Sequence, residues 1–301
     1  PFGGSTTARS DMIDQDEINV PEPWRSLDVA SWQGPVLVIG ASNTGKSTFA
    51  RYLYSRLLKT RDRVAFLDTD VGQNSYRLPT TLVMAQNGGP GDTSFPPQAA
   101  RRIWFVGSNA PPGHMLRVIL GIFRLTQALE NQALVVDTSG FVNPSYGGTN
   151  LKWAKVDLLR PCTVVTFQRE DELKPLLLPL HPLPGVRVVE LPVPEAVRDR
   201  PREERRAYRA RCYRDYFEKA PCISLNYHGV AVFPRRRFRE ERLVALEDRE
   251  GFVLALALIE GADDKLVHLR TPLSPSQKEE VAALRLGDLR IDRGSYQDGY
   301  I

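Results

Sequence analysis

The sequence predicts an α/β fold, in which a parallel sheet is covered by helices on both faces and is followed by a small β-rich C-terminal unit. Three observations predict it. Short apolar runs alternate with helical patterns over residues 36–220, a glycine-rich loop joins the first run to a helix, and short alternating stretches follow Pro221. Strands that alternate with helices form crossover units, which make neighbouring strands parallel. We therefore expect the binding site at the carboxyl ends of the strands.

The composition divides the chain into three segments. Residues 1–30 mix Gly, Ser, Thr, Asp and Pro with little apolar periodicity, so we expect a lead-in segment there. Residues 31–221 carry the strand and helix alternation, and residues 222–301 are expected to form the β-rich unit. In the central segment, apolar runs predict strands at Val36–Ile39, Val64–Leu67, Ile103–Val106, Leu134–Val136, Val164–Phe167 and Val186–Val189.

Helical patterns separate several of these runs. Pro201 begins one that continues to about Lys219, and the Gly- and Pro-rich segment 86–101 predicts a loop. The clearest helix is expected at 114–130, with a buried face made of Leu116, Ile119, Leu120, Phe123 and Leu125.

The overall composition favours an intracellular globular protein. Hydrophobic residues make up 42% of the 301 residues, which is enough for a sizeable core, and the net charge is +4. No apolar run approaches the length of about 20 residues that a membrane span needs. The three cysteines lie far apart, which fits a reducing compartment. We expect a cytoplasmic protein, or a nuclear one in a eukaryote, without membrane contact.

A phosphate-binding loop is the most specific motif. Residues 40–47, GASNTGKS, match GxxxxGK[ST] between a strand and a helix, which predicts a P-loop NTPase-like sheet. The glycines let backbone N–H groups converge on phosphate oxygens, and the helix adds its positive dipole end. Lys46 is expected to reach the β- and γ-phosphates, and Ser47 to ligate Mg²⁺. We expect ATP or GTP with Mg²⁺ as cofactors, bound by Gly40, Ala41, Ser42, Asn43, Thr44, Gly45, Lys46, Ser47 and Thr48.

Carboxylates follow two of the predicted strands. Asp68 and Asp70 alternate at a strand end and therefore point to the same side. Beside a magnesium nucleotide, one carboxylate can hold the ion while the other accepts a proton from an attacking hydroxyl. Asp137 ends a later strand in the same way and is a rival to Asp68 for the metal. We take Ser47 and Asp68 as the expected metal ligands.

Arginines gather in the helical segment that begins near Pro201. Residues 198–214 hold eight arginines against three acidic residues. A solvated helix face explains an isolated run of this kind, whereas next to a nucleotide site arginine suits bidentate contacts to phosphate.

Together these motifs resemble the Clp1/Grc3-type polynucleotide 5′-hydroxyl kinases. The phosphate loop, the run 68–73 (DTDVGQ), the run 105–111 (FVGSNAP) and the run 137–141 (DTSGF) stand in the order of that family, and residues 200–217 continue the likeness. The resemblance covers residues 36–220. In that family, the last segment is an arginine-bearing lid, here near 198–217, that closes over the transferring phosphate.

The resemblance implies a role for each matching residue. Lys46 would grip the phosphates, and Asp70 would orient and deprotonate the 5′-hydroxyl of a single-stranded RNA or DNA end. Arg200 and Arg205 would neutralise the transferring phosphoryl group. Gln73, Thr138 and Phe141 would bind the substrate, Phe141 by stacking on a terminal base where relatives often carry Trp. The resemblance names no protein partner.

Other functions remain open on the sequence alone. A catalytically silent ATP-binding scaffold in RNA processing would lack the lysine, the second carboxylate or the lid arginines, and all are present. A GTPase needs an Asn-Lys-x-Asp motif, and the nearest string, 154–157 (AKVD), lacks the Asn. A small-molecule kinase is distinguished only by whether the arginines and Phe141 line a groove long enough for several nucleotides.

Overall fold

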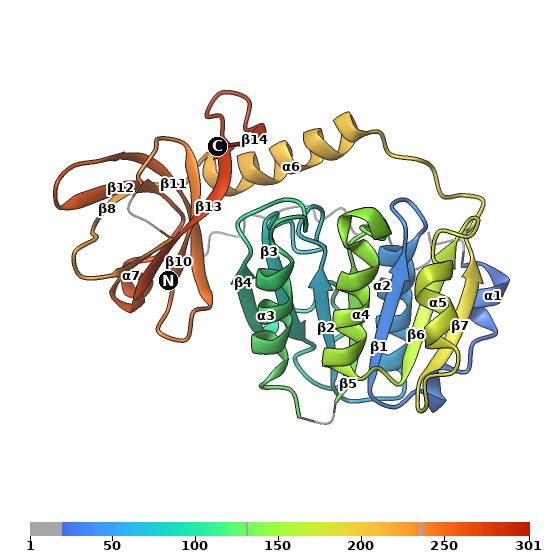
Figure 1. Cartoon of the computed structure of the whole chain (residues 1–301). Coiled ribbons are helices and arrows are strands. Elements are labelled where there is room, and N and C mark those ends of the chain that lie inside the picture. Colours follow the sequence, from blue (N-terminus) through green and yellow to red (C-terminus); the bar gives the residue numbers. More distant parts are fainter. Residues whose placement is uncertain (1–19, 131, 235–236) are drawn as a thin grey trace.

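The computed structural model describes residues 20–130, 132–234 and 237–301, which form two sheets joined by a long helix (Figure 1). The first sheet has the strand order β4-β3-β2-β5-β1-β6-β7. Its strands are β1 (Pro35–Gly40), β2 (Val64–Thr69), β3 (Thr81–Gln86), β4 (Ala99–Phe105), β5 (Ala133–Thr138), β6 (Thr163–Gln168) and β7 (Arg187–Pro192).

This sheet is mostly parallel, as the sequence predicts, but differs at one edge. Strand β3, which the apolar runs did not reveal, pairs antiparallel with both β2 and β4. Residues 87–98 between β3 and β4 contain no helix, so they cannot make the crossover that a parallel pair needs. Two successive reversals return β4 to the direction of β2. The loop after Phe105 therefore opens at the same edge as the phosphate loop.

Helices cover both faces of the first sheet. In β1, Val36 and Val38 pack with Phe49 of α2 on one face, whereas Leu37 and Ile39 pack with α3, α4 and α5 on the other. Figure 1 shows α3, α4 and α5 in front of the strands and α2 behind them. This alternation follows from the two-residue period of a strand. The helices are α2 (Lys46–Leu58), α3 (Met115–Thr126), α4 (Gly148–Leu159), α5 (Lys174–Leu180) and α6 (Arg202–Phe217), with a 3-10 turn η2 at Pro144–Tyr146.

The end of the expected lead-in packs on the first sheet. Residues 1–19 lie outside the described residues, but α1 (Glu22–Arg25) and the 3-10 turn η1 (Val29–Ser31) are described. Trp24 is only 2% exposed and meets the ring of Phe49 edge-on, with the centroids 5.2 Å apart. Residues from Val20 onward thus contribute to the core beneath α2.

The buried face of α3 differs from the predicted one. Leu116, Leu120 and Phe123 are 83%, 42% and 44% exposed, whereas Val118 and Ile122 are buried. Helix α3 is apolar around much of its circumference, so periodicity alone could not select the inner face. The structural reason is Gly121, which fits against Trp104 where a Cβ atom would lie 2.3 Å from the indole ring.

The β-rich C-terminal unit is confirmed. Its sheet has the order β14-β13-β10-β11-β12-β8, with β9 pairing parallel to β13. Most strands are linked by short turns and run antiparallel. The elements are β8 (Cys222–Asn226), β9 (Ala231–Phe233), β10 (Arg242–Glu247), β11 (Val253–Ala262), β12 (Leu266–Arg270), α7 (Pro275–Glu280), β13 (Ala283–Ile291) and β14 (Asp298–Tyr300).

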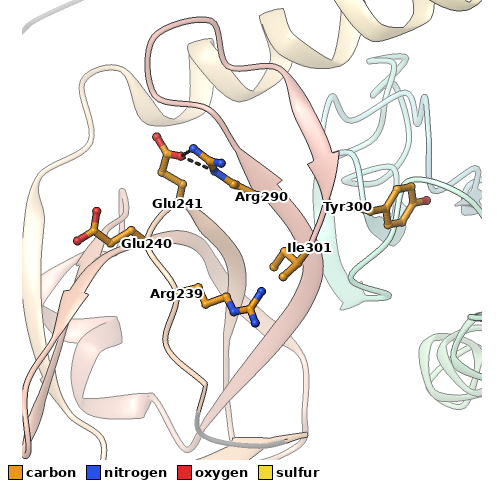
Figure 2. A pocket seen from close by; sticks show the side chains of 6 residues that line it. All are labelled: Arg239, Glu240, Glu241, Arg290, Tyr300 and Ile301. Carbon is orange, nitrogen blue, oxygen red and sulfur yellow. Dashed lines mark hydrogen bonds and ion pairs between the residues drawn. The ribbon is translucent and has the colours of Figure 1, made fainter.

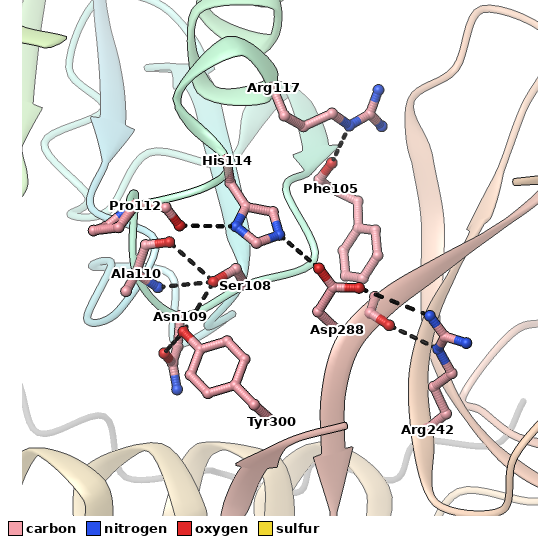
Figure 3. A network of polar contacts seen from close by, with 11 residues as sticks. Phe105, Ser108, Asn109, Ala110, Pro112, His114, Arg117, Arg242, Asp288 and Tyr300 are labelled. Atoms are coloured by element: carbon pink, nitrogen blue, oxygen red, sulfur yellow. Dashed lines mark hydrogen bonds and ion pairs between the residues drawn. The ribbon is translucent and has the colours of Figure 1, made fainter. Parts of the chain in front are cut away.

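A buried carboxylate joins the two sheets. Glu247 is fully buried and accepts hydrogen bonds from Arg285 at 2.7 Å and from Arg117 of α3 at 3.2 Å. Nearby, the carboxylate of Asp288 in β13 accepts a hydrogen bond from Nε2 of His114 at 2.9 Å (Figure 3). The backbone N–H of Asp288 donates to the carbonyl oxygen of Gly107 at 2.8 Å. The second sheet is therefore docked on the end of the first sheet beside α3.

Candidate active site

The phosphate loop lies between β1 and α2, where the sequence places it. Gly40 permits its fold, because a Cβ atom there would lie 2.6 Å from the carbonyl oxygen of Phe167. Gly45 has φ +86°, which only glycine adopts without strain. Helix α2 begins at Lys46, so the N–H groups of its first turn point toward the loop and are available to an anion.

Lys46 lies within the site rather than in solvent. Its side chain is 6% exposed, and the ammonium group donates a 2.6 Å hydrogen bond to the carbonyl oxygen of Ala41 in its own loop. Burial lowers the pKa of Lys46, while the negative charges of Asp137 and Asp70 oppose that shift. The amine is thus placed between the phosphate loop and the carboxylates of the neighbouring strands.

Asp68 and Asp70 have different surroundings. Both oxygens of Asp68 accept backbone hydrogen bonds, from Asp70 N–H at 3.0 Å and from Ser75 N–H at 2.7 Å. One oxygen of Asp70 accepts hydrogen bonds from the N–H groups of Gly72 and Gln73, at 2.8 and 3.1 Å, and the residue lines the pocket. Asp68 therefore shapes the turn, and Asp70 presents a carboxylate to the cavity.

Asp137, rather than Asp68, lies against Ser47. It is 1% exposed, and its carboxylate accepts a hydrogen bond from the Ser47 hydroxyl. Burial raises the pKa of Asp137 to about 6, against the opposing effects of the Ser47 hydrogen bond and the Lys46 charge. Its Oδ1 atom is buried without a hydrogen-bond partner among the described residues. The geometry therefore favours Asp137 over Asp68 as the carboxylate that faces a metal.

These residues fit a magnesium ion. No group of three or more His, Cys, Asp or Glu side chains that could hold a metal occurs among the described residues. Magnesium needs no such cage, because it usually keeps several waters and binds one or two protein oxygens together with phosphate oxygens. The Ser47 hydroxyl and the unpaired Oδ1 of Asp137 are suitable protein oxygens.

Two buried lysines were missed by the sequence reasoning. Lys152 and Lys155 of α4 are fully buried, and they donate to the hydroxyls of Thr138 at 3.0 Å and of Thr69 at 2.7 Å. Burial lowers the pKa of both, to about 8 for Lys155. The negative charges of Asp70 and Asp137 oppose this lowering in both lysines, so the two amines lie near the carboxylate cluster. The only signal was a pair of lysines three residues apart on a helix face that is otherwise buried.

The arginine-rich segment closes one side of the site. A cavity of about 430 Å³ is lined by the phosphate loop, by Asp70 and Gln73, and by Arg198, Arg200 and Tyr208 of the segment leading into α6 and of α6 itself. Arg205 lies on α6 but is not among the residues that line this cavity. Tyr208, which the resemblance did not single out, bonds to the carbonyl oxygen of Asn74 at 3.3 Å.

The other expected substrate residues occupy different places. Gln73 lines the cavity. Thr138 is fully buried, and its hydroxyl donates to the carbonyl oxygen of Val38 at 2.8 Å, so its side chain joins two strands instead of facing a substrate. Phe141 is partly buried against the core formed with α3 to α5 and does not line the cavity.

A second hollow lies on the C-terminal unit (Figure 2). Its volume is about 480 Å³, and it lies between the segment 239–241, Arg290 and the last two residues. The Arg290 guanidinium is paired with Glu241, at 2.6 Å from Nε to Oε2. None of the phosphate-loop residues lines it, so the cavity at the phosphate loop is the candidate active site.

Comparison with known proteins identifies the family. The family described as mRNA cleavage and polyadenylation factor CLP1 P-loop matches residues 40–219. A polyribonucleotide 5′-hydroxyl-kinase of Methanocaldococcus jannaschii is 30% identical over 73% of this chain, and one of Thermococcus kodakarensis is 32% identical over 71%. The chain spans 60% and 61% of the length of these two relatives.

The solved structures agree on the fold. The structure titled as a wild-type Clp1p–Pcf11p complex has a TM-score of 0.61 at 17% identity, covering 87% of this chain and 75% of that one.

Within the described ranges, no helix combines the length and apolarity that crossing a bilayer requires. The phosphate loop, the carboxylates beside it and the arginine-bearing helix all lie within the matched region. The chain belongs to the CLP1 P-loop family.

Proposed function

We propose that this protein is a polynucleotide 5′-hydroxyl kinase, which transfers the γ-phosphate of ATP or GTP to the 5′-hydroxyl end of RNA or DNA. The observation that carries the proposal is that the phosphate loop, Asp70 and Arg200 line one cavity. A donor site, a proton acceptor and a cation for the transferring group are the components that phosphoryl transfer needs. The names of the archaeal relatives support the same activity.

The residues divide the work between the two substrates. The phosphate loop and Lys46 bind the donor phosphates. The oxygen of the 5′-hydroxyl forms a bond to the γ-phosphorus, and Asp70 accepts the proton that this hydroxyl loses. The bond from that phosphorus to the bridging oxygen breaks, and the nucleoside diphosphate leaves. Arg200, with Arg205 brought in as the lid closes, would neutralise the charge on the transferring group. Ser47 and Asp137 would hold a Mg²⁺ ion, which would supply charge neutralisation to the donor phosphates.

The acceptor side is defined less fully than the donor side. Gln73 follows the Asp70 turn into the cavity, which suits a contact to the nucleic-acid end. Phe141 remains the candidate for stacking on a terminal base, a contact worth about 1–3 kcal/mol with little dependence on the base. Thr138 is better assigned to holding the strand ends together.

Substitution of the two buried aspartates would identify the residue that holds the metal. We expect Asp137→Asn to raise the Mg²⁺ concentration needed for nucleotide binding by about 10- to 100-fold, because it removes the charge beside Ser47. Asp68→Asn puts an NH2 group against a backbone N–H, so it should destabilise the turn, but it should change the Mg²⁺ requirement of the folded protein less than Asp137→Asn does. Calorimetric titration of nucleotide at varied Mg²⁺ measures both. The reverse order of effects would reinstate Asp68 as the metal residue.

A transfer assay tests the proposed function directly. The protein is incubated with γ-labelled ATP or GTP, Mg²⁺ and 5′-hydroxyl oligonucleotides of RNA and of DNA, with 5′-phosphorylated oligonucleotides as the matched control. We expect label on the 5′-hydroxyl ends only. Absence of transfer to either polymer, with nucleotide binding intact, would favour the silent scaffold. Transfer to a free nucleoside in preference to an oligonucleotide would favour a small-molecule kinase.

A further inference from the structure

Helix α6 packs into the protein core through its C-terminal half. Its C-terminal half carries Tyr213 and Phe217, which are 1% and 0% exposed and pack into the core of the second sheet with Phe105 and Leu243. Its N-terminal residues 202–207 are mostly exposed and carry Arg205. Figure 1 shows the helix reaching from the second sheet across the top of the first. The N-terminal half is attached by polar contacts instead, among them the bond from Arg206 Nη2 to the carbonyl oxygen of Asp298 at 3.3 Å.

Arg209 is a polar attachment of α6, four residues after Arg205 and therefore on the same face of the helix. Its Nε and Nη2 atoms donate to the carboxylate of Asp298, in β14, at 2.5 and 3.1 Å. The side chains of Arg209 and Asp298 are 15% and 2% exposed. This is a bidentate, charge-assisted ion pair that is mostly buried, and such pairs fix the relative orientation of the two side chains.

The same carboxylate also holds the loop after β4. The side-chain amide of Asn109 donates to Asp298 at 2.6 Å. Tyr300, also in β14, donates to the other end of that amide at 2.9 Å and bonds to Ser108, as Figure 3 shows for Tyr300, Asn109 and Ser108. Asn109 is thereby held at both ends of its side chain.

Asn109 in turn contacts the turn that carries Asp70. A Cβ atom on Gly72 would lie 3.0 Å from the carbonyl oxygen of Asn109, so the two backbones are in close contact. The Gly72 N–H is one of the two backbone groups that donate hydrogen bonds to the carboxylate of Asp70. A continuous path of contacts therefore runs from α6 through Arg209, Asp298 and Asn109 to the turn of Asp70.

We propose that Asp298 is a positioning residue that fixes α6, the helix that carries Arg205, relative to the turn of Asp70, by holding Arg209 of α6 and Asn109 of the loop after β4 on one carboxylate. It touches neither substrate. The inference rests on the proposed kinase function, because it assigns the C-terminal unit the task of aligning the two halves of that active site. Misplacement of catalytic groups by about 1 Å can cost about 10²-fold in rate.

Kinetics of three variants test this role. We expect Asp298→Asn to lower kcat by about 10- to 100-fold, while the affinity for ADP, set by the phosphate loop, stays within about twofold. Asn109→Ala leaves the Arg209–Asp298 pair in place and should lower kcat in the same direction, which keeps the test usable if Asp298→Asn does not fold. Asp264→Asn, an exposed aspartate of the same unit, is the matched control and should behave as wild type.

A double-mutant cycle separates positioning from general structural damage. In an Arg205→Ala background, Asp298→Asn should lower kcat by a smaller factor than in the wild type, because one of the groups that it positions is already missing. Losses that multiply, or a folded Asp298→Asn with wild-type kcat, would overturn the proposal. So would an equal loss of ADP affinity and kcat.

A readout without substrate distinguishes failure of this inference from failure of the kinase function. Hydrogen–deuterium exchange of the free protein should be faster in residues 202–209 and 107–113 of Asp298→Asn than in wild type, with residues 40–58 unchanged. Unchanged exchange in α6 of Asp298→Asn would refute the positioning role of Asp298, whatever the result of the transfer assay. If the wild-type protein transfers no phosphate but Asp298→Asn still shows this faster exchange, the positioning role of Asp298 is upheld and the kinase function is not.

Discussion

Asp70→Asn is expected to remove phosphoryl transfer almost completely while leaving nucleotide binding largely intact. The Asn side chain can still accept the N–H groups of Gly72 and Gln73, so the turn should keep its shape. What is lost is the charge that accepts the proton of the attacking hydroxyl. General-base contributions of this kind are about 10²- to 10⁴-fold in rate.

Single-turnover transfer with pre-bound ATP and Mg²⁺ measures this loss apart from binding and product release. Asp62→Asn is a suitable control, since Asp62 is exposed just before β2 and away from the cavity. An Asp70→Asn protein with wild-type turnover would show that Asp70 is not the base.

Removal of the lid arginines should give the second large effect. We expect Arg200→Ala to slow transfer by about 10³-fold, as found where an arginine finger is removed, with a much smaller change in nucleotide affinity. Arg200 lines the cavity, and its nearest acidic group is Glu204, with Nε and Oε1 3.9 Å apart. An exposed pair at this distance adds little stability, so the cost should fall on the reaction rather than on folding.

Arg205→Ala should act on the same step, although the structure places Arg205 outside the lining of the cavity. A loss of transfer in Arg205→Ala would therefore indicate that α6 closes over the bound substrates. Arg211→Ala removes an exposed arginine from the same helix and is the matched control. The paired measurement is kcat for transfer against Kd for ADP. Equal losses in both, or the same loss in Arg211→Ala, would contradict a transition-state role.

The sequence revealed those parts of the site that depend on neighbours along the chain. The phosphate loop and the Asp70 turn could be located because a strand, a short motif and a helix follow one another directly. Asp68 and Asp137 could not be ranked in this way. Both end buried strands, and only the three-dimensional packing shows that Ser47 bonds to Asp137 while backbone N–H groups bond to Asp68.

The remaining features depend on contacts between distant segments. The pairing of Asn109 with Asp298 joins residues 189 positions apart, and no local pattern reports it. The inner face of α3 is selected by the fit of Gly121 on Trp104, because its apolar residues surround the helix. Lys155 was read only as part of a failed guanine motif, and its burial beneath Thr69 was invisible without the fold.

The carboxylate of Glu247 limits how this protein can be divided. Its partners are Arg117 in the nucleotide-binding part and Arg285 in the C-terminal unit, and no part of its side chain is exposed. A cut near residue 221, where the composition changes, would leave Glu247 paired with Arg285 alone on a freshly exposed apolar surface, and would leave Arg117 in the other half without its carboxylate partner. A fragment that ended there would lose the contact between Arg117 and Glu247, which lies far from the cut in the sequence. The compositional boundary is therefore a poor choice of truncation site.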